Sequence, residues 1–194
     1  MAQEPSATRQ LAALLALVED VQRYFMLELE GGIATHRSRP ESWAFVGMDP
    51  ARALAQIAFA RDRLATHPAP LFLDCGAGLG FVGMMARGLG FRPSGIELST
   101  RYVELANRLL PWSGVVEGDV LDHPGYGEPD VIYYYGPFKD DTLQERFELR
   151  VETHAKPGAI IIANRKVSDA WTRSPRFEPI LEDGTGSWIF RKLG

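Results

Sequence analysis

The sequence has little cysteine and little histidine: one cysteine, Cys75, and four histidines among 194 residues. A single cysteine excludes an internal disulfide, which suits a reducing compartment. No histidine lies at a metal-ligand spacing from another histidine or from Cys75, so the sequence predicts no metal site. Cys75 is expected to be a small buried hydrophobic residue. The chain must therefore be held together by its own core, and its length suits one domain.

Long apolar runs are also missing. No stretch approaches the ~20 consecutive apolar residues of a membrane span, and the longest early run, residues 11–18, is too short. The N-terminus has Glu4 and only Arg9 as a cation before that run, and no clear cleavage site follows it. A signal peptide is therefore not expected. These absences predict a cytoplasmic protein with no membrane association.

An excess of positive charge is missing as well. The formal net charge is -4, and the isoelectric point is near 5.6. Nucleic-acid binders usually carry a basic stripe, so this balance argues against a nucleic-acid partner. The basic residues at 165, 166, 173 and 176 are interpreted as a solvated surface. The sequence also lacks a Gly-x-Ser-x-Gly elbow and a phosphate-binding Gly-Lys-Ser/Thr motif, which argues against common hydrolases and P-loop enzymes.

Residues 1–66 are predicted to form a helical extension or lid ahead of the core. Apolar positions at helical spacing predict a helix over residues 8–30, which ends at Gly31-Gly32. A second helix is expected to start after Asp49 as N-cap, with Pro50 at its first position, and to run to about residue 65. The first helix is compatible with packing on the core, with capping a site, or with forming a homodimer.

Residues 67–194 alternate between short strands and helices. Such alternation predicts an α/β fold with a doubly wound, mostly parallel sheet, and the last two strands flank a turn that predicts an antiparallel C-terminal hairpin. The expected strands are residues 71–73, 94–98, 114–117, 130–134, 159–163, 177–181 and 188–191. The expected helices are residues 81–89, 100–110 and 140–154.

The most informative segment is a glycine-rich turn between the first strand and its helix. Glycine occurs at alternate positions, 76, 78 and 80, directly after Asp74. Glycines let the backbone turn sharply and approach a ligand closely, and the turn lies at the carboxyl end of a strand, where open α/β sheets bind ligands. Two further carboxylates follow the next strands: Glu97 can accept the hydroxyls of a ribose, and Asp119 the amino group of an adenine.

Two nucleotide cofactors are compatible with the glycines alone. Gly78-x-Gly80-x-x-Gly83 also satisfies the dinucleotide-binding pattern, which leaves an NAD(P)-dependent oxidoreductase as an alternative. Asp74 argues against it, because a carboxylate there would repel a pyrophosphate and would suit a cationic amino-acid tail. Asp119 similarly fits an adenosine that lies across three strand ends.

In this order and spacing, the motifs resemble those of class I S-adenosylmethionine-dependent methyltransferases, over residues 68–193. The resemblance implies a Rossmann-like seven-stranded sheet, S-adenosyl-L-methionine as cofactor and transfer of its methyl group. It assigns the methionine part to Asp74 and the turn, the ribose to Glu97 and the adenine to Asp119. The full set implied for the cofactor is Asp74, Gly76, Ala77, Gly78, Gly80, Glu97, Leu98, Asp119, Val120 and Tyr135.

The sequence says less about the residues that face the methyl acceptor than about those that hold the cofactor. In the resembled family the end of the fourth strand faces the methyl group, and here it carries Tyr135 and Phe138 without an Asn-Pro-Pro-Tyr motif. A fainter likeness to seven-strand protein-lysine methyltransferases makes Trp43, Phe45 and Val46 candidates for a lid. No catalytic acid or base is identified, so the acceptor stays open between a small molecule and a protein side chain. A protein that binds the cofactor without catalysis is a third alternative.

Overall fold

A computed structural model describes residues 7–30, 46–64, 66–182 and 186–194, which form one mixed sheet flanked by helices. The helices are α1 (Ala7–Glu30), α2 (Pro50–Arg63), α3 (Phe81–Gly88), α4 (Thr100–Leu109), α5 (Asp141–His154) and a short 3-10 helix, η1 (Ala170–Arg173). The strands are β1 (Leu71–Cys75), β2 (Arg92–Glu97), β3 (Val115–Glu117), β4 (Val131–Tyr135), β5 (Ile160–Asn164), β6 (Phe177–Glu182) and β7 (Trp188–Lys192).

The seven strands follow the order β3-β2-β1-β4-β5-β7-β6. The first five strands in this order are parallel to one another, whereas β7 runs antiparallel to both β5 and β6. The predicted doubly wound, mostly parallel sheet with an antiparallel C-terminal hairpin is therefore confirmed. The turn predicted at residues 183–186 lies mostly outside the described residues. The parallel register brings the ends of β1, β2, β3 and β4 to one edge of the sheet.

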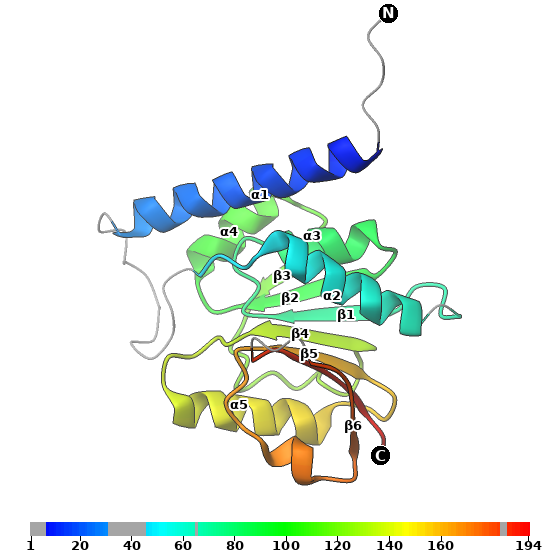
Figure 1. The fold of residues 1–194 in the computed structure, drawn as a ribbon. Helices are drawn as coiled ribbons and strands as arrows, with labels where there is room; N and C mark the ends of the chain where they lie inside the picture. The colour runs from blue at the N-terminus through cyan, green and yellow to red at the C-terminus, as the bar shows by residue number, and fades with distance from the viewer. Residues whose placement is uncertain (1–6, 31–45, 65, 183–185) are drawn as a thin grey trace, which may run out of the picture.

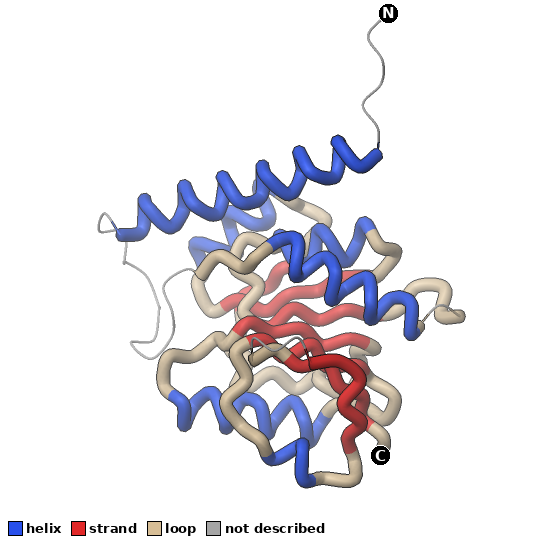
Figure 2. Tube along the Cα trace, viewed as in Figure 1, coloured by secondary structure: helices blue, strands red, loops and turns tan. Residues whose placement is uncertain are grey.

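Helices cover both faces of this sheet, as Figures 1 and 2 show. Helices α2, α3 and α4 lie on one face, and α1 crosses outside them as a further layer (Figure 1). Helix α5 and η1 lie on the opposite face (Figure 1). Because both faces are covered, all five residues of β5 are buried, as expected of a central parallel strand.

Each face of the sheet has its own hydrophobic core. On the α5 side, Phe147 lies in the centre of a cluster that includes Tyr134 and Phe190. On the other side, α2 contributes Ala53 and Ile57 to a cluster with residues of β1, β4 and β5. The helical segment ahead of β1 therefore shares a core with the sheet.

Two helix starts agree with the capping chemistry of the sequence. The Asp49 side chain accepts a hydrogen bond from the Arg52 N–H at 3.1 Å, and Pro50 is the first residue of α2, as predicted. Asp140 caps α5 in the same way, accepting from the Leu143 N–H at 2.9 Å. Such caps satisfy backbone donors that a helix leaves unpaired.

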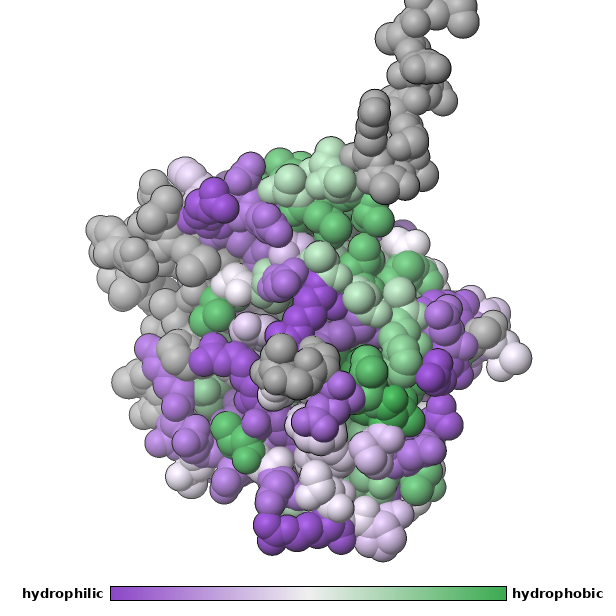
Figure 3. Space-filling model, in the orientation of Figure 1, coloured by the Kyte–Doolittle hydropathy of each residue, from purple (hydrophilic) through white to green (hydrophobic). Residues whose placement is uncertain are grey.

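Helix α1 buries part of its apolar stripe and leaves the rest exposed. Leu11 and Leu14 belong to the predicted stripe but are 43% and 41% exposed. The buried positions are Val18 and, unexpectedly, the polar Gln22, one turn further on. Apolar residues accordingly gather at the surface over α1 (Figure 3). Helix α1 therefore meets the core through Leu15 and Val18 of the apolar stripe, together with the polar Gln22.

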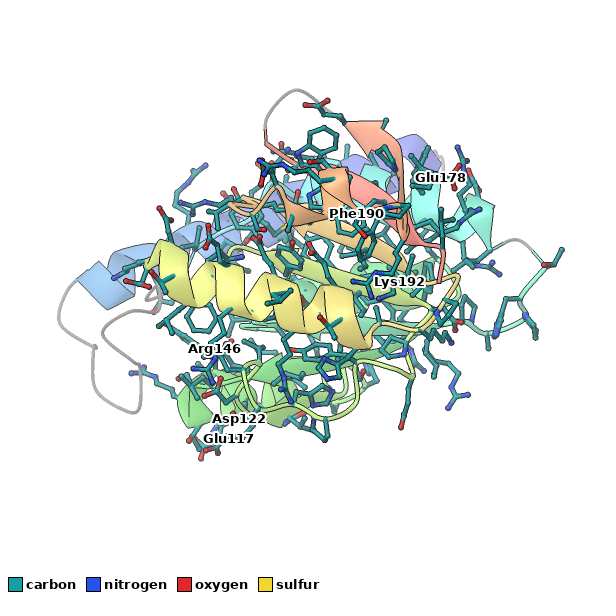
Figure 4. All side chains as sticks on the ribbon, turned by 90° about the horizontal axis from the view of Figure 1, so that it is seen from below. Glu117, Asp122, Arg146, Glu178, Phe190 and Lys192 are labelled. Atoms are coloured by element: carbon teal, nitrogen blue, oxygen red, sulfur yellow. The ribbon has the colours of Figure 1, made fainter. Side chains whose placement is uncertain are left out.

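A buried ionic cluster joins α5 to the segment that follows β5. Lys166 Nζ lies 2.9 Å from Glu148 Oε2 and 2.6 Å from Glu152 Oε1, and all three side chains are almost fully buried. At the C-terminal end of α5, Lys192 donates to the Glu152 carbonyl. Figure 4 shows Phe190 and Lys192 of β7 beside this helix. The basic residue at 166 is thus a buried structural cation, and the prediction that it belongs to a solvated surface was wrong.

Candidate functional site

A cavity opens at the sheet edge where β1, β2, β3 and β4 end. Its volume is about 980 Å³ when counted out to the solvent at its mouth. It is lined by Gln22, Val46, Met48, Asp74, Gly76, Ala77, Gly78, Leu79, Phe81, Val82, Ile96, Glu97, Leu98, Tyr102, Gly118, Asp119, Val120, Tyr133, Tyr135, Gly136, Pro137 and Phe138.

The glycine-rich turn forms the floor of this cavity and is tied to β2. The N–H groups of Gly76 and Ala77 both donate to the Ile96 carbonyl at 2.9 Å. Gly76 and Gly78 have φ angles of 82° and 53°, which favour glycine over residues with a Cβ. The turn is thus a fixed bend that presents backbone to the cavity.

Gly80, the last glycine of the turn, does not line the cavity. Its φ is 80°, and a Cβ there would lie 3.0 Å from the Cβ of Ser113. Glycine at this position is therefore required for close packing behind the turn. Its assignment to the cofactor rests on the sequence resemblance alone.

Glu97 lines the cavity at the end of β2 and is held by two backbone donors. Oε2 accepts from Gly78 N–H at 2.9 Å, and Oε1 accepts from Ser99 N–H at 2.8 Å. Burial raises the pKa of this carboxyl, and the backbone hydrogen bonds oppose the rise. Each oxygen retains a further lone pair, so the carboxylate can still accept from the hydroxyl groups of a ligand.

Asp74 is the most unusual group of the site. It is 3% exposed, and its Oδ2 is buried without a hydrogen-bond partner. Burial, and secondarily the negative charge of Glu97, raises its pKa to about 8. An unpaired buried carboxyl costs stability, so its presence in a cavity wall favours a binding role over a structural one. The arrangement would suit a positively charged ligand group.

The end of β3 supplies the third predicted acid. Asp119 lines the cavity, and its Oδ1 accepts from the Leu121 N–H at 2.9 Å, which fixes the local turn. Val120 and Leu98 also line the cavity. The structure therefore brings Asp74, Glu97 and Asp119 to one cavity, as the sequence predicted for three adjacent strand ends.

The end of β4 forms an aromatic wall. Tyr133 and Tyr135 line the cavity, whereas Tyr134 points to the opposite face, where its ring lies 5.1 Å from that of Phe147. The predicted alternation of these tyrosines is confirmed. Phe138 also lines the cavity, and its N–H donates to the Gln144 side chain at 3.2 Å.

Several cavity residues were not identified from the sequence. Gln22 and Met48 come from segments ahead of the core, and Tyr102 comes from the first turn of α4. Only Gln22 has a visible signal, a polar residue within an apolar helical stripe. Of the predicted lid residues, Val46 lines the cavity; Trp43 and Phe45 lie outside the described residues.

Three further findings concern the residues that the structure describes. None of their histidine, cysteine and acidic side chains gather in groups that could hold a metal ion. Among the helices described, none is both long and apolar enough to cross a bilayer. Cys75 is buried, as expected.

Comparison with solved structures identifies the fold. A TehB-like S-adenosylmethionine-dependent methyltransferase from Corynebacterium glutamicum matches over 91% of this chain and 98% of its own, with a TM-score of 0.52 and 16% identity. An RNA methyltransferase from Salinibacter ruber, solved with S-adenosyl-L-homocysteine, matches over 76% and 92%, with a TM-score of 0.53 and 18% identity. The chain has the fold of the class I S-adenosylmethionine-dependent methyltransferases.

This methyltransferase fold differs from the dinucleotide-binding one in strand order. The classic dinucleotide-binding sheet has the order 3-2-1-4-5-6, whereas here an antiparallel β7 lies between β5 and β6. The order therefore does not favour the NAD(P) alternative.

The matched proteins share little sequence with this chain, and some of them are considerably longer. Streptomyces venezuelae DesVI matches with a TM-score of 0.50 and 21% identity, over 71% of this chain but only 61% of its own. The chain spans about half of two other matched proteins. No protein-family model and no curated protein matches the sequence.

Proposed function

We propose that the protein binds S-adenosyl-L-methionine in this cavity and catalyses transfer of its methyl group to an acceptor, either a small molecule or a protein side chain. The observation that carries the proposal is the unpartnered Oδ2 of Asp74, buried beside the glycine-rich turn. The ammonium group in the methionine part of the cofactor would supply the positively charged partner that this carboxyl lacks. The bound cofactor would supply an electrophilic methyl group on a positively charged sulfur.

The residues present fit this cofactor. Asp74 and the Gly76–Gly78 bend would hold the methionine part, Glu97 the ribose, and Asp119 with Val120 the adenine. Tyr135 and Phe138 would line the path of the methyl group. An aromatic ring near a cationic centre contributes about 0.5–2 kcal/mol. These residues mainly bind and orient the reactants, and positioning alone supplies up to roughly 7–11 kcal/mol in favourable systems.

Isothermal titration with three ligands tests the proposal. The protein is expected to bind S-adenosylmethionine and S-adenosylhomocysteine with one site each and to show no binding of NADH. Binding of NADH alone would support an oxidoreductase and contradict the proposal. Incubation with cofactor labelled at the methyl group then tests catalysis on cell extracts; binding without any labelled product would support a catalytically silent protein.

Replacing Glu97 with alanine is expected to weaken binding of S-adenosylhomocysteine by about 1.5–3 kcal/mol, the usual contribution of hydrogen bonds to a charged group. Glu104 on α4 is an exposed carboxylate, and Glu104→Ala is the matched control, with unchanged affinity. Titration calorimetry on both variants, with melting temperatures to check folding, measures the effect. A folded Glu97→Ala variant that binds as tightly as the parent would remove the ribose assignment.

A further inference from the structure

Gln22 of α1 makes an unusual contact with the segment that precedes α2. Its Oε1 accepts a hydrogen bond from the Met48 N–H at 2.8 Å, and its Nε2 donates to the Met48 carbonyl at 3.1 Å. Gln22 itself is 5% exposed. One side-chain amide thus satisfies both backbone groups of one residue, as a neighbouring strand would. This pair of bonds fixes the orientation of the chain at Met48.

The segment held in this way forms a wall of the cavity. Gln22, Val46 and Met48 all line it, although they lie ahead of the seven-stranded sheet in the chain. Packing and strand register give its position along the cavity. Met48 packs against the hydrophobic cluster that contains Tyr133, and Tyr133 is the register partner of Asp74 on the neighbouring strand β1. The wall therefore lies at the end of the cavity near Asp74 and Tyr133.

Helix α1 has few other anchors among its described side chains. Val18 is buried and Leu15 packs against the core on the α2 side, whereas Leu11, Leu14 and Leu17 are between 41% and 59% exposed. The two bonds to Met48 therefore add polar anchors to the apolar contacts that join this helix to the core. Loss of these bonds would free both α1 and the wall it holds.

We infer that Gln22 is a positioning residue of the ligand site: it holds residues 46–48 as a wall over the methionine end of the cofactor. This inference rests on the proposed function. A ligand bound behind the wall leaves when the wall opens. The two hydrogen bonds between Gln22 and Met48 hold the wall in place, so they slow ligand dissociation. The site is incomplete without α1, even though every residue that the cofactor motifs identify lies after residue 73.

The test compares dissociation of S-adenosylhomocysteine from the full-length parent and from Gln22→Met. Methionine has a similar length and flexibility but cannot make either bond to the backbone of Met48. The dissociation rate is expected to rise about 5- to 30-fold with little change in association rate, as is usual when contacts around a bound ligand are lost. Leu17→Ala, on the exposed face of α1, is the matched control and should dissociate like the parent.

A purely structural role would lower the melting temperature of Gln22→Met without changing ligand dissociation, and that result would overturn the inference. Gln22→Glu gives a second, more conservative variant, because it keeps an acceptor for the Met48 N–H and loses the donor; its dissociation rate should lie between those of the parent and Gln22→Met. A rate equal to that of the parent would contradict the inference.

Hydrogen exchange in the parent tests the same idea without substitution. The Met48 amide should exchange slowly, and more slowly still when S-adenosylhomocysteine is bound. An amide at Met48 that exchanges as fast as an unstructured peptide in both states would overturn the inference, whatever the variants show. Failure of the parent to bind S-adenosylhomocysteine would instead count against the proposed function, so the two failures are distinguishable.

Discussion

Replacing Asp74 with asparagine is expected to weaken binding of S-adenosylhomocysteine and, at the same time, to stabilise the ligand-free protein. The carboxylate is buried, and removal of one partner of a buried ion pair leaves the ligand ammonium uncompensated. The expected loss is about 3 kcal/mol, or roughly 150-fold in the dissociation constant. Without ligand, the same carboxyl has an orphaned Oδ2 in an apolar wall, so its neutral replacement relieves an unfavourable burial.

The stability that Asp74→Asn gains over the parent should increase with pH. The pKa of Asp74 is about 8 in the folded protein and near 3.8 when exposed, so the folded state keeps a proton that the unfolded state releases. The parent's free energy of unfolding should therefore fall as pH rises from about 4 to about 8. Glu97, Tyr133 and Cys75 also face or adjoin this group, and their pKa values are raised as well.

Urea unfolding of ligand-free protein at pH 5 and pH 8 measures this effect. The advantage of Asp74→Asn over the parent should be about 2–4 kcal/mol at pH 8 and smaller at pH 5. Asp62→Asn, an exposed acid of α2, is the control and should change neither stability nor affinity. A variant that binds S-adenosylhomocysteine like the parent would remove Asp74 from the site, and a destabilised variant would contradict its description as an unpaired buried acid.

Replacing Lys166 with methionine is expected to cause a large loss of stability. Its side chain is 1% exposed, and its ammonium lies between Glu148 and Glu152, whose side chains are 0% and 6% exposed. Breaking a buried ion pair by removing one partner typically costs about 3–5 kcal/mol, because the remaining charge is left uncompensated. Glu148 also accepts hydrogen bonds from the backbone of residues 167 and 168, so the segment after β5 should loosen too.

Urea unfolding at neutral pH tests this prediction against an exposed ion pair. Arg173 pairs with Asp169, but the two side chains are 77% and 67% exposed. Arg173→Met should therefore change stability by no more than about 1 kcal/mol. Equal losses of stability in the two variants would show that burial does not determine how much the Lys166 ion pairs contribute to stability.

The sequence predicts well which strand-end residues meet at the cavity, because its signals there are local. Glycines 76 and 78 need left-handed backbone, and Asp74 and Glu97 end or nearly end their strands. Each position follows from a few neighbouring residues. Parallel pairing of β1, β2 and β3 then brings these ends together, and alternation along β4 separates Tyr134 from Tyr135.

The remaining parts depend on contacts that no local pattern encodes. Gln22 and Met48 are 26 residues apart, and a glutamine in an apolar stripe does not name its partner. The buried position of Lys166 likewise follows only from two acids on α5, 14 and 18 residues earlier in the chain. At Gly80 a local pattern predicts too much. This glycine belongs to the cofactor motif, but in the structure it packs against Ser113 and does not line the cavity.

A crystal structure of the complex with S-adenosylhomocysteine tests the central claim most directly. The account predicts the amino group of the ligand within hydrogen-bond distance of Asp74 Oδ2, the ribose hydroxyls on Glu97, and the adenine beside Asp119 and Val120. The sulfur should face the aromatic wall at Tyr135. A ligand bound elsewhere, or one whose amino group leaves Asp74 Oδ2 without a partner, would contradict the account.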